Sequence, residues 1–176
     1  MNAWTIPIRM PPARAHMRAD PRLAFEVIGA FGTSQPDGSG ARVLRTDPGG
    51  RLLVEFRTRV PTLRGGNRIQ RTVERVTLRS PERIDFEGVE GPLRVLRDRF
   101  TFADFDGCTE FTYESTFAIG WSVVGWLIGW LYARPLLGRF MREHVEELRE
   151  TVEARAARSR QYPQPACPHR ADRRRE

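Results

Sequence analysis

A few polar side chains occupy positions that would set them against apolar surface, and these are the candidates for chemistry. Asp98 and Arg94 share the alternation of Phe100 and Phe102, provided that their strand is unbroken. Both would then point inward, either as a buried ion pair or as groups that hold the polar end of an apolar ligand, whereas a bulge would return them to solvent. Tyr113 would join them as an acid–base candidate.

His144 is the one histidine inside an apolar helical stripe. It is either a histidine of the core or cavity edge, or a general base, and a base would need an orienting partner that the sequence does not identify. The chain has no lysine, which excludes Schiff-base chemistry. Nucleophile-elbow, phosphate-loop and dinucleotide-binding motifs are also missing, so the catalytic residues stay unknown and no cofactor is expected.

The cysteines suggest neither a disulfide framework nor a metal site. Cys108 follows an expected turn and Cys167 lies in a proline-rich segment, so we expect two free thiols, which fit a reducing cytosol. Cys167 and His169 lack a second ligand pair at zinc spacing, and no metal is expected. Residues 1–9 show no charged segment followed by an apolar run, so no signal peptide is expected and the predicted location is cytoplasmic.

Charge is concentrated at the C-terminus. Of the formal net charge of +7, residues 158–176 hold +4, from six arginines against two acids. The remaining +3 is ordinary, and no nucleic-acid-reading motif accompanies it. Because this basic segment also contains three prolines, we expect a single domain over 1–157 and a disordered tail over 158–176.

Turn residues divide the middle of the chain into short β segments. A short strand over 13–19, extended by 4–10, precedes a helix that Asp20 caps and Pro21 begins. Asp106-Gly107 is a strong hairpin signal between two strands whose apolar residues alternate with polar ones. The expected strands after this helix are 41–46, 51–60, 67–79, 82–88, 93–104 and 108–119.

A long apolar helix follows the strands. It starts near Trp121, is uncharged as far as Ala133, and should kink or restart at Pro135. Gly125 and Gly129 would allow close approach of a strand, a ligand or another helix. Residues 115–133 carry no charge, but the first five complete a strand and the rest are too short to span a bilayer.

The order of strand, short helix, six strands and long helix resembles the START/Bet v 1-like helix-grip superfamily, also called SRPBCC. The resemblance covers residues 13–157 and includes Ala19-Asp20-Pro21, the Gly91-Pro92-Leu93 start of a strand, and Phe111-Thr112-Tyr113. It is greatest to the coenzyme-Q-binding, ribosome-association and cyclase/dehydrase branches. It implies a fold and a pocket rather than a reaction.

We therefore expect an α+β helix-grip domain in which a curved antiparallel sheet of about seven strands wraps around a long C-terminal helix. The expected function is binding or transport of a lipid, quinone or polyketide-like molecule between sheet and helix. One alternative is a polyketide cyclase or dehydratase using the same cavity, and another is a module bound to the ribosome or another macromolecule. Contact of residues 121–131 with a membrane surface is a further expectation. The expected ligand-binding residues are Phe100, Phe102, Phe111, Tyr113, Phe117, Trp126, Trp130, Phe140, Met141 and His144.

Overall fold

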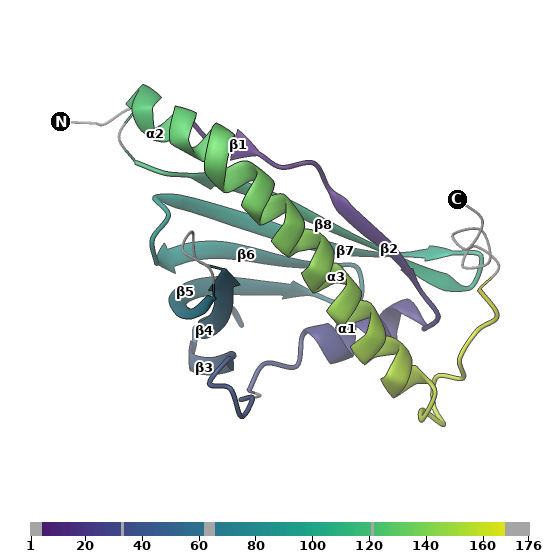
Figure 1. The fold of residues 1–176 in the computed structure, drawn as a ribbon. Coiled ribbons are helices and arrows are strands. Elements are labelled where there is room, and N and C mark those ends of the chain that lie inside the picture. Colours follow the sequence, from purple (N-terminus) through teal and green to yellow (C-terminus); the bar gives the residue numbers. More distant parts are fainter. Residues whose placement is uncertain (1–4, 33, 62–65, 121, 168–176) are drawn as a thin grey trace, which may run out of the picture.

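The fold is an antiparallel sheet that packs around one long C-terminal helix (Figure 1). A computed structural model describes residues 5–32, 34–61, 66–120 and 122–167. The strands are β1 (Ile8–Arg9), β2 (Ala13–Met17), β3 (Gly40–Thr46), β4 (Leu52–Pro61), β5 (Asn67–Arg79), β6 (Arg83–Glu90), β7 (Val95–Phe105) and β8 (Cys108–Ala118). The helical segments are α1 (Pro21–Ile28), α2 (Ser122–Ile128), the π-helical η1 (Gly129–Ala133) and α3 (Arg134–Ala156).

The sheet runs in the order β1-β8-β7-β6-β5-β4-β3. Strand β2 lies on the same side of β8 as β1 and pairs with the first half of that strand. All neighbours are antiparallel. The helix-grip prediction is confirmed, and the six middle strands begin and end within two residues of the expected positions. Pro11-Pro12 separates β1 from β2, as expected for residues that cannot complete a ladder.

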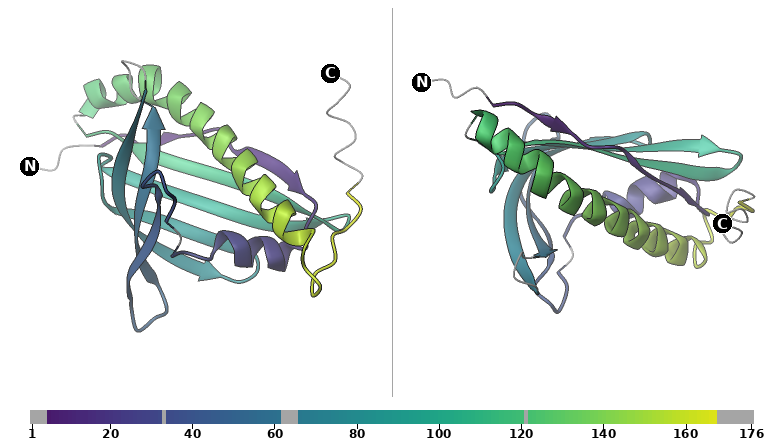
Figure 2. Two further views of the ribbon diagram at one scale, coloured as in Figure 1. Left: turned by 60° about the horizontal axis from the view of Figure 1, so that its bottom comes forward. Right: turned by 45° about the horizontal axis from the view of Figure 1, so that its top comes forward.

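The predicted hairpin at Asp106-Gly107 is present. Both residues have positive φ, 51° and 80°, as a two-residue turn of this type requires. Beyond it, β8 alternates between buried residues, namely Phe111, Tyr113, Ser115 and Phe117, and half-buried polar ones. The buried set faces the helices, which lie together on one side of the sheet (Figure 2). The core therefore lies between the inner face of the sheet and α1 and α3.

Helix α1 begins as its sequence predicts. The Asp20 side chain accepts a 2.8 Å hydrogen bond from the backbone N–H of Arg22, and Pro21 occupies the first helical position. Leu23 and Phe25 are buried, and the Phe25 ring meets Phe102 of β7 edge-on at 5.7 Å. Helix α1 thus closes one end of the core.

The long helix passes through Pro135 without breaking. The expected interruption is instead a wider π-helical turn just before it, in which the Arg134 N–H donates to the carbonyl of Gly129. A proline cannot donate to the carbonyl four residues earlier and crowds it, and one wider turn relieves both problems. As a result, α2, η1 and α3 follow one another along a single rod (Figure 1).

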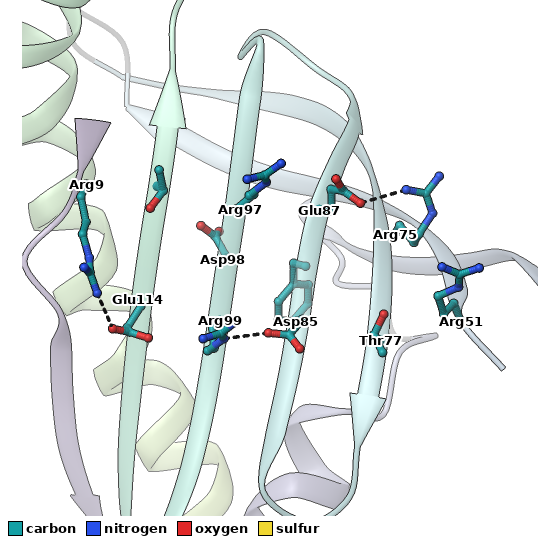
Figure 3. Close-up of a pocket in the computed structure, with 12 residues that line it drawn as sticks. Arg9, Arg51, Arg75, Thr77, Asp85, Glu87, Arg97, Asp98, Arg99 and Glu114 are labelled. Atoms are coloured by element: carbon teal, nitrogen blue, oxygen red, sulfur yellow. Dashed lines mark hydrogen bonds and ion pairs between the residues drawn. The ribbon is translucent and has the colours of Figure 1, made fainter. Parts of the chain in front are cut away.

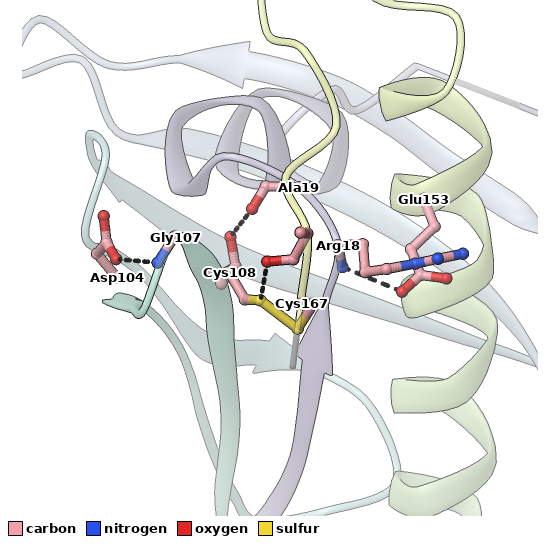
Figure 4. Close-up of a disulfide and its surroundings, with 9 residues drawn as sticks. Arg18, Ala19, Asp104, Gly107, Cys108, Glu153 and Cys167 are labelled. Carbon is pink, nitrogen blue, oxygen red and sulfur yellow. Dashed lines mark hydrogen bonds between the residues drawn. A yellow bond between two sulfur atoms is a disulfide. The ribbon is translucent and has the colours of Figure 1, made fainter. Parts of the chain in front are cut away.

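The cysteines correct our expectation of free thiols. Cys108 at the start of β8 and Cys167 form a disulfide, with a Cα–Cα distance of 5.6 Å (Figure 4). This removes the argument that unpaired thiols made for a reducing compartment. Residues 158–167, expected to be disordered, instead lie along the domain, and Tyr162 packs against the core and donates a 3.2 Å hydrogen bond to Glu26. The rest of the expected tail, 168–176, lies outside the described residues, so its disorder stays a prediction.

Candidate functional site

A polar pair lies on the largely apolar inner face of the sheet. Asp98 of β7 and Tyr113 of β8 point toward the helices, and the Tyr113 hydroxyl donates a 2.9 Å hydrogen bond to Asp98 Oδ2. The pairing register explains this contact, because Asp98 lies opposite Ser115 and Phe100 lies opposite Tyr113 on the adjacent strand. Ser115 is itself buried and lies beside Asp98 on the same face.

The other oxygen of this carboxyl group, Asp98 Oδ1, is buried and has no hydrogen-bond partner within the described part of the chain. Burial raises the pKa of Asp98 to about 6, although the hydrogen bonds from Ser115 and Tyr113 oppose that rise. Burial also raises the pKa of Tyr113 well above its usual value, so this phenol is a donor at neutral pH. A buried carboxylate oxygen without a donor is uncommon and indicates a place where a ligand group can bind.

A second buried carboxyl group lies further along the inner face, on β5. Glu74 is only 8% exposed and accepts a 2.8 Å hydrogen bond from the Thr72 hydroxyl. Burial raises its pKa to about 7, and the negative charge of Asp98 adds to that rise. The strand between the two acids has glycine at the position opposite Glu74, namely Gly88, so no side chain projects inward there. Two acids that titrate near neutral pH thus share one interior surface.

Helix α3 covers this surface with His144 and Phe140. The two rings stack at 5.6 Å, and the His144 ring lies 6.4 Å from the rings of both Tyr113 and Phe100. Burial lowers the pKa of His144, although Glu147 opposes the change. The side chain is still 34% exposed, so His144 marks an edge of the site that solvent reaches.

Aromatic rings form a continuous apolar wall beside the acids. Phe100 contacts Phe86 at 4.8 Å, and Phe86 contacts Phe56 at 6.1 Å and Phe31 at 6.2 Å. Phe86 also lies directly opposite Asp98 in the sheet. The arrangement offers hydrogen-bonding groups at one end and ring faces and edges along the rest, which suits an apolar molecule with one polar end.

The structure brings four of the ten expected ligand-binding residues together at this site, namely Phe100, Tyr113, Phe140 and His144. Phe102 and Phe111 are buried nearer α1, and Phe117 is buried against the Gly129 end of the helix. Met141 is buried on α3. Trp126 is half-buried, whereas Trp130 is 46% exposed and stacks on it at 6.4 Å. The assignment of all ten residues to ligand binding stays a prediction.

The polar residues of the inner face depart from expectation in two ways. Asp98 points inward as its alternation predicted, but its partner is Tyr113 rather than Arg94. Arg94 precedes β7, is exposed, and packs against Gly120, so the expected buried Asp–Arg pair does not form. Glu74 was missed, and its shared alternation with Val76 was the available signal. A bulge between Val73 and Glu74 interrupts the strict alternation at this point. As a result, these two consecutive residues are both buried.

The outer face of the sheet has a different chemistry (Figure 3). It contains a depression of about 460 Å³ lined mainly by arginine and carboxylate side chains. Most of these charges are paired, as in Arg99–Asp85 at 2.8 Å and Arg75–Glu87 at 2.9 Å. The mixture of signs makes this depression a poor site for an apolar molecule and weakens its attraction for phosphates.

Comparison with known proteins supports the fold. Residues 13–153 match the family described as polyketide cyclase/dehydrase and lipid transport. Among curated proteins, no match is found. Solved structures that are similar include TTHA0849 from Thermus thermophilus, with a TM-score of 0.62 at 16% identity over 82% of this chain and 98% of that one.

Two further structures are similar over most of their length. The Zhui aromatase/cyclase from Streptomyces sp. R1128 has a TM-score of 0.61 at 16% identity, covering 87% of this chain and 95% of that one. A START superfamily protein from Mycobacterium smegmatis has a TM-score of 0.58 at 13% identity, covering 86% and 99%. At these identities the likeness concerns the fold alone.

Proposed function

Since the chain belongs to the polyketide cyclase/dehydrase and lipid transport family, we propose that it binds a hydrophobic small molecule between its sheet and α3. The observation that carries the proposal is the buried, unpartnered Oδ1 of Asp98 beside the Tyr113 hydroxyl, within the described part of the chain. A hydroxyl or phenol on the ligand would donate to this oxygen, while its apolar skeleton would pack along Phe100, Phe86 and Phe56. Lipid, quinol and polyketide-like molecules have this chemistry.

Burial of the apolar part supplies most of the affinity in this proposal. At about 25 cal/mol per Å² of apolar area removed from water, a mid-sized ligand reaches micromolar affinity without a charge contact. The hydrogen bond to Asp98 then sets the orientation. Because a hydrogen bond to a charged group contributes about 1.5–3 kcal/mol, its loss should weaken binding by roughly tenfold or more.

The test starts with native mass spectrometry of protein purified without detergent, followed by extraction and identification of any bound species. The identified compound is then titrated into the wild type, Asp98→Asn and the control Asp104→Asn, which makes the same change at an exposed site on β7. We expect weaker binding only for Asp98→Asn. Equal affinity of the three proteins would contradict the proposed role of Asp98.

The same groups favour a second candidate, a cyclase or dehydratase acting on a polyketide-like chain. Such a reaction needs one group that removes a proton and another that delivers one, and the carboxyls of Asp98 and Glu74 have pKa values of about 6 and about 7. Likeness to an aromatase/cyclase supports this candidate through the fold only. Turnover of a polyketide-like substrate that survives both Asp98→Asn and Glu74→Gln would count against these two carboxyl groups as its acid and base.

A further inference from the structure

The first turns of the long helix expose an apolar surface at one end of the molecule. We call six residues the apolar helix tip: Val123, Val124, Leu127, Trp130, Leu131 and Tyr132. Their exposed fractions run from 46% to 65%. A contiguous apolar surface of this kind on a folded domain marks a site of interaction rather than chance exposure. In Figure 1 this part of the helix lies at the end far from α1.

The opposite side of these turns is already occupied by the domain itself. A Cβ atom added at Gly129 would lie 2.6 Å from Ile8 Cδ1, and one at Gly125 would overlap the carbonyl oxygen of Gly120. The two glycines therefore let the helix pack closely on β1 and on the segment before α2. This small-residue surface is not available to a second helix, and only the large apolar side chains face outward.

Along the chain, the charged residues nearest the apolar helix tip on its C-terminal side are arginines. The sequence has no acidic residue between Glu114 and Glu143, whereas Arg134, Arg139 and Arg142 follow the tip along the helix. The Arg134 guanidinium lies 5.9 Å from the centre of the Trp130 ring, and Arg139 and Arg142 are exposed. An apolar surface bordered by arginines complements an anionic, water-facing layer with an apolar interior.

We propose that the apolar helix tip docks on the surface of an anionic lipid bilayer. Tryptophan and tyrosine favour the boundary between lipid and water, and arginines beside them would contact lipid phosphates. The ten residues 123–132 extend about 15 Å at 1.5 Å per residue, against a hydrocarbon core of about 30 Å. Among the described helices, none has the length and apolarity needed to cross a membrane. The helix would therefore lie in the interface.

A second copy of the chain is the competing occupant, and the charges argue against it. A twofold contact in which the two helices run side by side in the same direction would bring Arg134, Arg139 and Arg142 of both copies close together, with no acid in residues 115–142 of either chain. Like charges at such short range oppose association. The bilayer proposal does not depend on what the interior site binds, since it concerns a surface on the outside of the long helix.

Vesicle flotation tests the proposal with full-length protein. The vesicles are phosphatidylcholine alone and phosphatidylcholine mixed with phosphatidylglycerol. The variants are Leu127→Glu, Arg139→Gln and the control Val89→Glu, where Val89 on β6 has the same 48% exposure as Leu127. Circular dichroism verifies that each variant is folded, and light scattering after size exclusion measures the oligomeric state.

We expect the wild type and Val89→Glu to float with the anionic vesicles and much less with the neutral ones. Leu127→Glu should weaken this binding at least tenfold, and Arg139→Gln about fivefold, since one basic residue near an anionic surface contributes about 1 kcal/mol. Failure of the wild type to bind the anionic vesicles overturns the proposal. So does equal loss in Leu127→Glu and Val89→Glu, or a wild-type dimer that Leu127→Glu dissociates, because a second copy would then cover the tip.

Discussion

Tyr113 donates a 2.9 Å hydrogen bond to one oxygen of Asp98 and leaves the other oxygen buried without a donor among the described residues. The contact joins adjacent strands, β7 and β8, on the face that α3 covers. One oxygen of the carboxyl group is thus used within the protein, and the other is the atom to which we propose that a ligand donates. Substitutions at this contact and in the packing around it have distinct expected effects.

Tyr113→Phe should raise the pKa of Asp98 above about 6. The phenol hydrogen bond stabilises the ionised carboxylate, and its removal leaves burial less opposed. Carboxyl carbon shifts followed by NMR over a pH titration measure this directly. An unchanged midpoint would mean that the hydrogen bond does not form in solution.

Glu74→Gln should stabilise the protein above neutral pH and have little effect near pH 4. Burial raises the folded pKa of Glu74 from 4.5 to about 7, so the folded state holds a proton that the unfolded state has lost. Stability from this group therefore falls as pH rises from about 4.5 to about 7, by up to about 3 kcal/mol.

Denaturant unfolding at several pH values measures this difference. The control is Glu87→Gln on the outer face, where the exposed Glu87–Arg75 pair contributes little. A stability gain for Glu74→Gln that is the same at pH 4 and pH 8 would contradict the assignment of a raised pKa.

Alanine substitutions at Gly129 and Gly125 should destabilise the protein to different extents, because the added Cβ atoms meet different neighbours. The Cβ of Gly129→Ala meets the mobile end of Ile8, whereas that of Gly125→Ala meets the backbone oxygen of Gly120. We expect destabilisation by about 1 kcal/mol and about 3 kcal/mol respectively.

Gly138→Ala is the matched control on the same rod, because its Cβ would have only ordinary contacts, the nearest at 3.5 Å from Met10. It should stabilise the helix by up to about 1 kcal/mol. Thermal unfolding of the three variants ranks them, and stabilisation by all three would show that α2 does not pack as described.

Cys167→Ser should be less stable than the oxidised wild type by about 4 kcal/mol, because the disulfide joins residues that are 59 positions apart. Protein purified without reductant should be two hydrogens lighter than its reduced mass. Once the bond is absent, limited proteolysis should cut within residues 158–167. Two titratable thiols in the unfolded, unreduced wild type would show that the cysteines do not pair.

Local sequence signals predicted most of the fold. The Asp20 cap, the Asp106-Gly107 turn and the alternation of residues 111–117 each depend on a few neighbouring residues, and each has the expected structure. The inward direction of Asp98 agrees with its shared alternation with Phe100 and Phe102, which was one of the two alternatives that the sequence left open. Helix and strand formation is governed by such short-range geometry, so the sequence alone determined element order, strand boundaries and the side of the sheet that is apolar.

Contacts between distant segments were decided only by the tertiary structure. The disulfide between Cys108 and Cys167 and the place of Glu74 beside Asp98 depend on strand register, a bulge and the path of the chain after α3. The exposure of Trp130 depends on the side of the helix on which Gly125 and Gly129 pack. A carboxyl or thiol has the same local sequence signature whether or not a partner reaches it, and only packing brings that partner.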